Sequence, residues 1–349
     1  ASDTVTDGVS VYDNISVKEI DVDPTTARYL PRLGHHVYNG SAWVNEGLLH
    51  ESEARTNLVT YSEAFDNSAW NNVQGTKTAD VIAAPDGTLS GDKYTPSTNS
   101  GEHYIETNLT PATGTFTDSV YAKSGGYSDV VIRPIHIGAN ESASQNAVFD
   151  LSTGKVRVKS SGTTATIEEV GNGWYRCSFT YTVSGTLSGA YQFRLQAYNG
   201  STIFAGDGTS GIYLWGAQRE TASTPSSYIP TSGATATRAS ESLTIPAANL
   251  PYSSTAMTIQ MDGRVTYADT GGDEVKFVDW RLDGSNFILY YLQTTNERTG
   301  LVRFAQDKDG VFDSVATSDT LISPDILVPY SISSRHGSTF INGAVDGVA

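Results

Sequence analysis

Apolar and polar residues alternate in short runs along most of the chain, most clearly over residues 56–231. Runs such as FTDSVYAK, WYRCSFTYTV, AYQFRLQAY and GIYLWGAQ place an apolar side chain at every second position, which is the period of a strand with one buried face. Gly, Pro, Asn, Asp or Ser bounds each run. The runs follow one another at roughly 8–12 residues, as in antiparallel sandwiches. The pattern predicts an all-β protein, with one two-sheet antiparallel sandwich of about ten strands in this segment.

The alternation also assigns side chains to the two faces of each strand. In FTDSVYAK it predicts Val120 and Ala122 in the core, and it places Tyr121 and Lys123 on the outer face. In AYQFRLQAY it predicts an inward set and an outward set: Tyr191, Phe193, Leu195 and Ala197 inward; Gln192, Arg194, Gln196 and Tyr198 outward. Large aromatic rings and a lone cysteine are usually buried, so three more core residues are expected: Trp174, Trp215 and Cys177.

The rest of the chain divides around this segment. Residues 1–20 contain GVSVYDNISVKE, which is similar to GIYLWGAQRE at the end of the long β segment, so we expect the closing strand or strands of an upstream β module. The pattern over residues 21–55 predicts an irregular connector, and Asn39-Gly40 within it is a turn signal typical of a small hairpin. A linker at 232–240 and a further β segment at 241–349 follow. The expected architecture is therefore a tandem of jelly-roll-like sandwich modules, with the first and last incomplete.

Several sequence words occur together in a specific order: ARTNLVTYSEAFDNSAW, APDGTLSGDKY, FTDSVYAKSGG, FDLSTGKV, VGNGWYRCSFTYT, IYLWGAQRE and SSYIPTSGATATRAS. This series, over about residues 54–240, resembles the carbohydrate-binding-module-like β-sandwich of bacteriophage head spikes and tail fibres. The same module also occurs beside polysaccharide-degrading catalytic domains. Residues 241–349 resemble, more weakly, the start of a concanavalin-like or laminin-G-like domain. The resemblance implies a virion protein that adheres to host-surface glycan, commonly as a homotrimer.

Charge and composition exclude some partners. The formal net charge is −16 and the chain has no run of Lys or Arg, whereas a nucleic-acid surface needs a basic face. No apolar run approaches the ~18 residues of a membrane helix, so we expect no membrane insertion. The single cysteine cannot form an intrachain disulfide.

The sequence carries no convincing catalytic motif: it has no nucleophile elbow, no HExxH and no phosphate-binding loop. We therefore expect a protein that is not an enzyme and needs no cofactor. Three aspartates in the turns GDGTS and DKDG are weak calcium candidates, because calcium prefers oxygen ligands: Asp207, Asp307 and Asp309. Ordinary Asp-Gly turn chemistry explains these residues equally well.

A glycan site needs aromatic rings for the apolar face of a sugar and planar polar groups for its hydroxyls. The predicted outward residues supply both, and the candidate glycan-binding set is Tyr121, Lys123, Arg133, Gln192, Arg194, Gln196 and Tyr198. Alternation places Arg133 and His136 on opposite faces of their strand, so at most one of the two can join this set unless Pro134 marks a bulge. The alternative is an ordinary solvated face.

The sequence is compatible with three functions. The first is a non-catalytic virion fibre or spike that binds host glycan. The second is the accessory carbohydrate-binding region of a polysaccharide lyase or hydrolase. The third is a purely structural virion component. The connector HHVYNGSAWVNEGLLHESEART resembles phage particle proteins more than secreted enzymes, which favours the first function and a location on the virion.

Overall fold

The computed structural model describes residues 32–136, 145–187, 189, 191–241, 256–267, 274–294, 300–316, 322–323, 325–337 and 340–347. Every regular secondary-structure element in these ranges is a β-strand, so the predicted all-β class is confirmed. The same ranges hold no helix long and apolar enough to cross a membrane. The strands predicted within residues 1–20 lie outside the described residues.

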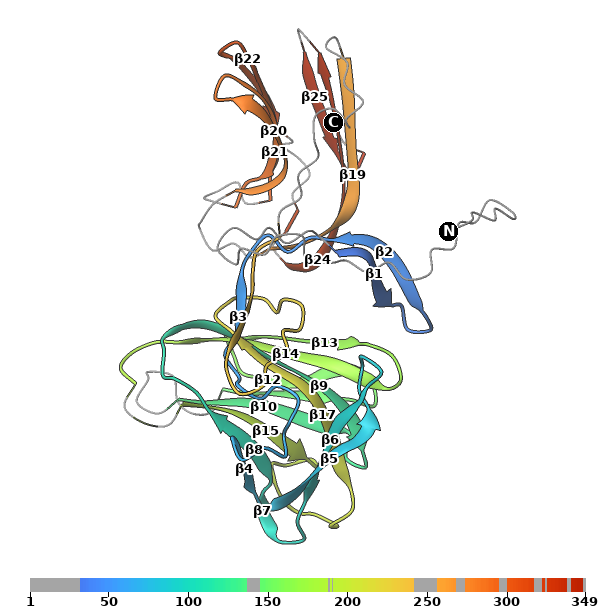
Figure 1. The fold of residues 1–349 in the computed structure, drawn as a ribbon, viewed down its shortest axis with the longest axis vertical. Helices are drawn as coiled ribbons and strands as arrows, with labels where there is room; N and C mark the ends of the chain where they lie inside the picture. Colours follow the sequence, from blue (N-terminus) through green and yellow to red (C-terminus); the bar gives the residue numbers. More distant parts are fainter. Residues whose placement is uncertain are drawn as a thin grey trace, which may run out of the picture.

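Two six-stranded antiparallel sheets form the first sandwich (Figure 1). The β10–β15 sheet has the order β12 (Lys155–Lys159), β11 (Ala147–Asp150), β10 (Asp129–His136), β15 (Tyr191–Tyr198), β8 (Tyr104–Asn108) and β4 (Trp70–Val73). The β9–β17 sheet has the order β13 (Thr164–Glu169), β14 (Trp174–Val183), β9 (Gly114–Gly125), β17 (Gly211–Glu220), β6 (Leu89–Pro96) and β5 (Gly75–Ala83). A two-stranded sheet of β7 (Ser100–Glu102) and β16 (Ile203–Ala205) accompanies them.

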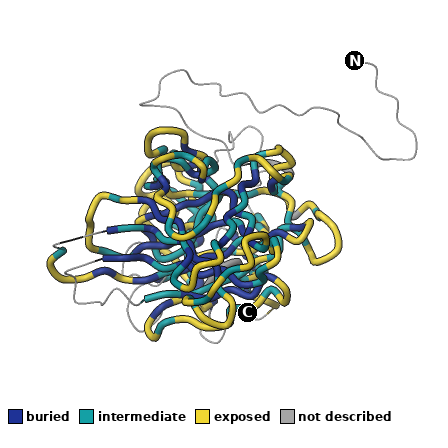
Figure 2. The backbone as a smooth tube through the Cα atoms, turned by 90° about the horizontal axis from the view of Figure 1, so that it is seen from below, coloured by how far each residue is buried: buried dark blue, intermediate teal, exposed yellow. Residues whose placement is uncertain are grey.

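The core of this sandwich lies between the two sheets, where the buried segments gather, while exposed ones lie in the loops (Figure 2). The predicted inward residues are confirmed, because Val120, Ala122, Phe193 and Leu195 are fully buried in one cluster. Cys177 belongs to the same cluster, and burial raises the pKa of its thiol. Its thiol is therefore held in the unreactive, protonated form at neutral pH.

A bulge at Gly216 changes the alternation of the closing strand β17. Gly216 has a φ of +63°, and the pairing of β17 with β9 shifts by one residue between Trp215 and Gln218. Before the bulge Leu214 faces the sandwich core, and after it Ala217 does. The extra residue therefore turns Arg219 inward. Without the bulge, a period of two would have turned Gln218 and Glu220 inward instead.

Trp174 and Trp215 are buried as predicted, but they do not lie between the two sheets. Together with Ala84 they form a second cluster, on the outer face of the β9–β17 sheet. The chain after β17 returns over this face, and Tyr228 packs against the Trp215 ring with centroids 4.6 Å apart. The expectation that both tryptophans anchor the main core is corrected in this respect: they attach the returning segment to the outside of the sandwich.

The returning segment is fixed by polar side chains that the bulge turns outward. Gln218 accepts a hydrogen bond from the Ile229 backbone N–H at 2.7 Å, and Glu220 accepts one from that of Ser226 at 2.9 Å. The fully buried Asn57 donates from its amide to the carbonyl oxygens of Ala217 and Ile229, at 3.1 and 2.9 Å. Residues of the sequence runs ARTNL, WGAQRE and SSYIP therefore have a structural role, because they pack and form hydrogen bonds with one another within the fold.

The segments that lead into and out of the first sandwich run side by side (Figure 1). β3 (Arg55–Asn57) pairs with β18 (Ala236–Arg238), which lies within the predicted linker. Beside this ladder, the Glu51 N–H donates to the Glu241 carboxylate at 2.6 Å, and the Glu241 N–H donates to the Glu51 carbonyl at 2.9 Å. We call residues 51–57 with 236–241 the neck, because it joins the sandwich to both flanking parts of the chain.

A hairpin precedes the neck, within the connector that the sequence predicts to be irregular. It consists of β1 (Arg32–Tyr38) and β2 (Trp43–Leu49). Residues 39–42 form its turn, in place of a two-residue turn at Asn39-Gly40. The Asn39 side-chain oxygen accepts hydrogen bonds from the backbone N–H groups of Ser41 and Ala42 at 3.1 and 3.0 Å, which stabilises the longer turn.

The second module is also built from two antiparallel sheets. One has the order β19 (Ala256–Tyr267), β24 (Asp325–Gly337) and β25 (Ile341–Val345). The other has the order β20 (Val275–Asp283), β21 (Asn286–Leu292), β22 (Val302–Lys308) and β23 (Val311–Ala316). Residues from both sheets share one buried cluster that includes Phe304 and Ile332. The fold is thus all-β with tandem sandwich modules.

His336 gives this second core a dependence on pH. Its Nε2 lies 2.6 Å from the Tyr290 hydroxyl, and burial lowers its pKa from 6.5 to about 4. The His336 side chain therefore binds a proton more tightly in the unfolded chain than in the folded one. Its contribution to the free energy of unfolding is fully present above pH 6.5 and is lost as the pH falls towards 4. We expect the thermal transition of the second module, measured by calorimetry, to fall over this range, and His336→Gln to reduce that fall. An equal fall in both proteins would contradict this.

Candidate functional site

The fold divides the predicted glycan-binding residues between two opposite surfaces. Tyr121 and Lys123 lie on β9, whereas Arg133 lies on β10 and the remaining four lie on β15. Because the two sheets pack face to face, their outer faces point in opposite directions. Tyr121 is further covered by Tyr228, with ring centroids 6.1 Å apart. The sequence-predicted set therefore does not form one site.

The outer face of the β10–β15 sheet keeps part of the set together. Arg133 and Arg194 are directly opposite each other on neighbouring strands. Their guanidinium groups share Glu102, with Arg133 Nη1 at 2.9 Å and Arg194 Nη1 at 3.7 Å from its carboxylate oxygens. Arg194 also donates from Nε and Nη2 to Glu106 at 3.0 and 2.8 Å.

Tyr104 and Gln192 extend this arrangement along the face. The Arg194 guanidinium lies over the Tyr104 ring, 3.7 Å from its centroid, and burial raises the pKa of the Tyr104 hydroxyl. Gln192 Nε2 donates to Glu106 at 2.9 Å and to Asn108 at 3.0 Å. We call this group the outer band; its members are Glu102, Tyr104, Glu106, Arg133, Gln192 and Arg194.

The sequence-predicted residues near the band differ in their access to solvent. Gln196 is fully buried, so it is not available to a ligand. His136 is buried on the core side, where its ring stacks on Tyr181 with an interplanar angle of 2°. The prediction that only one of Arg133 and His136 reaches the outer face is therefore confirmed. Tyr198 is half-buried and lies directly opposite Asp129 on β10.

A second ion-pair group occupies the β11–β12 side of the same sheet. Arg157 Nη2 lies 3.0 Å from the Asp129 carboxylate and 2.8 Å from that of Asp150. A hydrogen bond from the Ser152 hydroxyl is the main reason why the pKa of Asp150 falls to about 2. Both aspartates are thus held by Arg157, and the group is satisfied within the fold.

Sequence reasoning missed Glu102, Tyr104 and Glu106, three of the six residues in the outer band. The run GEHYIETNL carried the signal, because its even-numbered residues alternate with the buried Ile105. The same alternation that selected Arg194 would have placed Tyr104 and Glu106 on the outer face of β8, whereas Glu102 lies on the preceding strand β7. Alternation along one strand does not predict which strand lies next to it, so it could not show that β8 is the neighbour of β15.

The calcium candidates take part in turns. Asp207 accepts hydrogen bonds from the Thr209 and Ser210 N–H groups at 2.8 and 2.6 Å, and a side-chain hydrogen bond from Ser210 is the largest of the effects that lower its pKa. Asp307 accepts a hydrogen bond from the Gly310 N–H at 2.9 Å, and Asp309 has a φ of +54° in the same turn. Within the described ranges, no group of three or more His, Cys, Asp or Glu residues is arranged to hold a metal ion.

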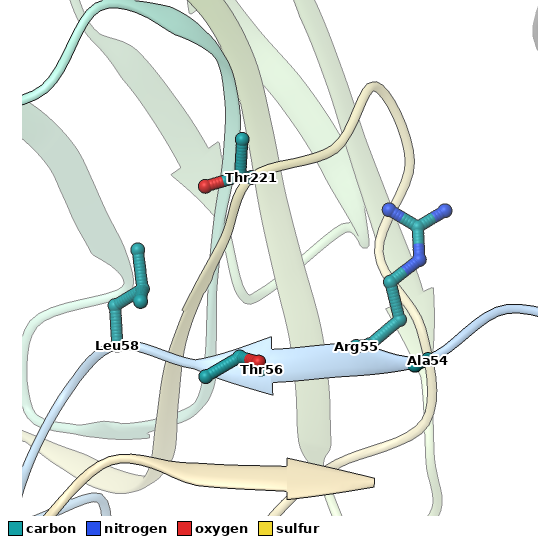
Figure 3. A pocket seen from close by; sticks show the side chains of 5 residues that line it. All are labelled: Ala54, Arg55, Thr56, Leu58 and Thr221. Carbon is teal, nitrogen blue, oxygen red and sulfur yellow. The ribbon is translucent and has the colours of Figure 1, made fainter. Parts of the chain in front are cut away.

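A shallow hollow of about 250 Å³ lies beside β3 (Figure 3). Its lining consists of Ala54, Arg55, Thr56, Leu58 and Thr221. The one charged side chain of the lining, Arg55, forms an ion pair with Glu53 at 2.6 Å. The remaining side chains supply methyl groups and two hydroxyls, so we assign no ligand to this hollow.

Comparison with known proteins adds little to this description. Neither a protein-family model nor a curated protein matches the chain. Among solved structures, the chain is similar to the tripod from the baseplate of bacteriophage Tuc2009, with 11% sequence identity and a TM-score of 0.23. That alignment covers 77% of this chain and 98% of the baseplate chain.

Proposed function

We propose that this protein is a non-catalytic component of a bacteriophage virion, a tail fibre or head spike, which adheres to glycan on the host surface. The proposal includes other virion proteins as partners and the homotrimer that the resemblance implies. The ordered series of sequence words over about residues 54–240 supports the assignment to such particles.

The observation that carries the proposal of glycan binding is the outer band on the β10–β15 sheet. Its guanidinium, amide and carboxylate groups are planar, and hydrogen bonds and ion pairs hold them on a rigid sheet. Fixed polar groups of this kind orient a hydroxyl-rich ligand at low entropic cost. Two arginines and two glutamates balance in charge, which suits a neutral glycan.

Substitutions on this face test the proposal. Arg133→Ala and Tyr198→Ala should each weaken binding to host cells or isolated surface glycan by roughly 1–2 kcal/mol, if both side chains contact the ligand. Arg194→Ala is a poorer test, because it would leave the nearly buried Glu106 without its cation and destabilise the sheet. Titration of the full chain on host cells, with melting temperature measured in parallel, gives the readout.

Lys93→Gln is a matched control. Lys93 lies on β6 in the opposite sheet, where its ammonium donates to the Thr209 carbonyl at 2.9 Å. The variant removes a positive charge as Arg133→Ala does, so it should bind like the wild-type protein. Unchanged binding in Arg133→Ala, with folding intact, would show that the outer band is not the glycan site, and unchanged binding in Tyr198→Ala would exclude the neighbouring position on the same face of β15.

A further inference from the structure

The hairpin that precedes the neck presents an exposed pair of aromatic rings. Tyr38 and Trp43 are paired across β1 and β2, and their rings meet edge to face with centroids 5.7 Å apart. Trp43 is 48% exposed, whereas Trp70, Trp174 and Trp215 are all buried. A half-exposed indole is costly to hydrate, and large rings of this kind commonly serve recognition where one side is packed and the other is wet.

The aromatic pair is held against the first sandwich. It packs on the turn between β13 and β14, where a Cβ on Gly171 would lie 3.3 Å from both Trp43 Nε1 and the Tyr38 ring. Gly171, Asn172 and Gly173 all have left-handed φ angles, of +84°, +53° and +76°. The backbone of the turn VGNGW therefore lies directly against the rings. A side chain at position 171 would be strained at this φ and would need the rings to shift slightly.

Polar groups follow Gly171 on the turn against which the rings pack. The Lys123 ammonium donates to the Asn172 carbonyl at 2.6 Å, and within the described ranges no carboxylate lies within ion-pair distance of Lys123. Asn172 itself is exposed. The surface thus combines two aromatic rings with an ammonium and a side-chain amide, on an anchored hairpin and a fixed turn.

We infer that Tyr38, Trp43, Asn172 and Lys123 form a second glycan-binding site, in which a pyranose ring stacks on the exposed indole and its hydroxyls bind Lys123 and Asn172. The C–H face of a pyranose is the apolar partner that a half-exposed indole lacks, and its equatorial hydroxyls reach polar groups at the rim of the ring. This inference rests on the proposed glycan adhesion but places a contact away from the outer band, on the β1–β2 hairpin beside the β9–β17 sheet.

The test uses the full chain and soluble hexasaccharides of glucose, galactose and N-acetylglucosamine. Binding is followed by calorimetry and by tryptophan fluorescence. Trp43 and Trp280 are the two tryptophans that are not buried, so the part of the fluorescence change that Trp43→Ala removes reports on the site. We expect at least one of the three to bind, and Trp43→Ala to weaken that binding by about tenfold or more, as for a central contact residue. Lys123→Gln should weaken it as well. Leu48→Ala is the matched control, since Leu48 is a similarly exposed residue of the same hairpin.

The outcomes separate this inference from the function on which it rests. If the wild-type chain binds none of the hexasaccharides, both this site and the proposed binding of neutral glycan fail. If binding is weakened by Arg133→Ala but not by Trp43→Ala, the proposed function stands and the hairpin site is overturned. Equal losses in Leu48→Ala and Trp43→Ala would also overturn it, because they would point to hairpin folding rather than to ring stacking. Melting curves of each variant accompany the titrations.

Discussion

Replacement of Asp118 with alanine is expected to lower the free energy of unfolding of the first sandwich by about 3–5 kcal/mol, since it leaves a buried arginine without its counter-charge. Arg219 donates from Nε and Nη2 to the two carboxylate oxygens of Asp118, each at 2.5 Å. Both side chains are fully buried between the sheets, with the Tyr181 hydroxyl 3.3 Å from the same carboxylate. Urea unfolding of the full chain, followed through the first sandwich, measures the change.

A double variant distinguishes the loss of a partner from the value of the pair itself. Asp118→Leu with Arg219→Met replaces both charges by apolar groups, and buried pairs replaced in this way often cost little or even become more stable. The double variant should therefore recover most of the stability that Asp118→Ala loses. A loss of less than about 1 kcal/mol in Asp118→Ala would mean that water reaches Arg219, contrary to its complete burial.

Trp215→Ala is expected to lower the free energy of unfolding of the first sandwich by a similar amount, about 3–5 kcal/mol. This is the usual range for deleting a buried large aromatic side chain. The Trp215 ring fills the cluster outside the β9–β17 sheet, packs on Tyr121 and Tyr228, and donates from Nε1 to the Ser90 hydroxyl at 3.0 Å. The same unfolding experiment applies.

Trp43→Ala provides the comparison, because it deletes the same side chain from a half-exposed position of the hairpin. Its effect on the first sandwich should be close to the ±0.5 kcal/mol typical of surface changes. If Trp215→Ala were no more costly than Trp43→Ala, the returning segment would not be part of the cooperative unit.

The sequence was sufficient to predict which side chains of a strand share a face. The alternation in β15 placed Phe193 and Leu195 in the core correctly. It was not sufficient to predict the candidate site, because parity refers to one strand and does not say in which sheet that strand lies. Lys123 and Arg194 both occupy outward positions of their strands, yet the two strands, β9 and β15, belong to different sheets.

Two further features, one local and one long-range, could not be predicted from a period of two. A single residue in the left-handed conformation at Gly216 reverses the faces of everything that follows in β17, and so sends Arg219 into the core. The outer face of β9 was expected to be solvated, but a segment more than a hundred residues later in the chain covers Tyr121. Long-range coverage of this kind depends on the path of the chain, which alternation does not encode.

The geometry of the neck determines how the first sandwich responds to mechanical load. β3 and β18 are antiparallel, with Arg55 opposite Arg238 at the end from which both flanking segments depart. A pulling force applied through those segments would meet the Glu51–Glu241 bonds first and then the ladder bonds one after another, as in a zipper, rather than all at once in shear. The neck would thus yield at low force and act as an extensible tether, while the Asp118–Arg219 pair and the two six-stranded sheets remain unloaded until it has opened.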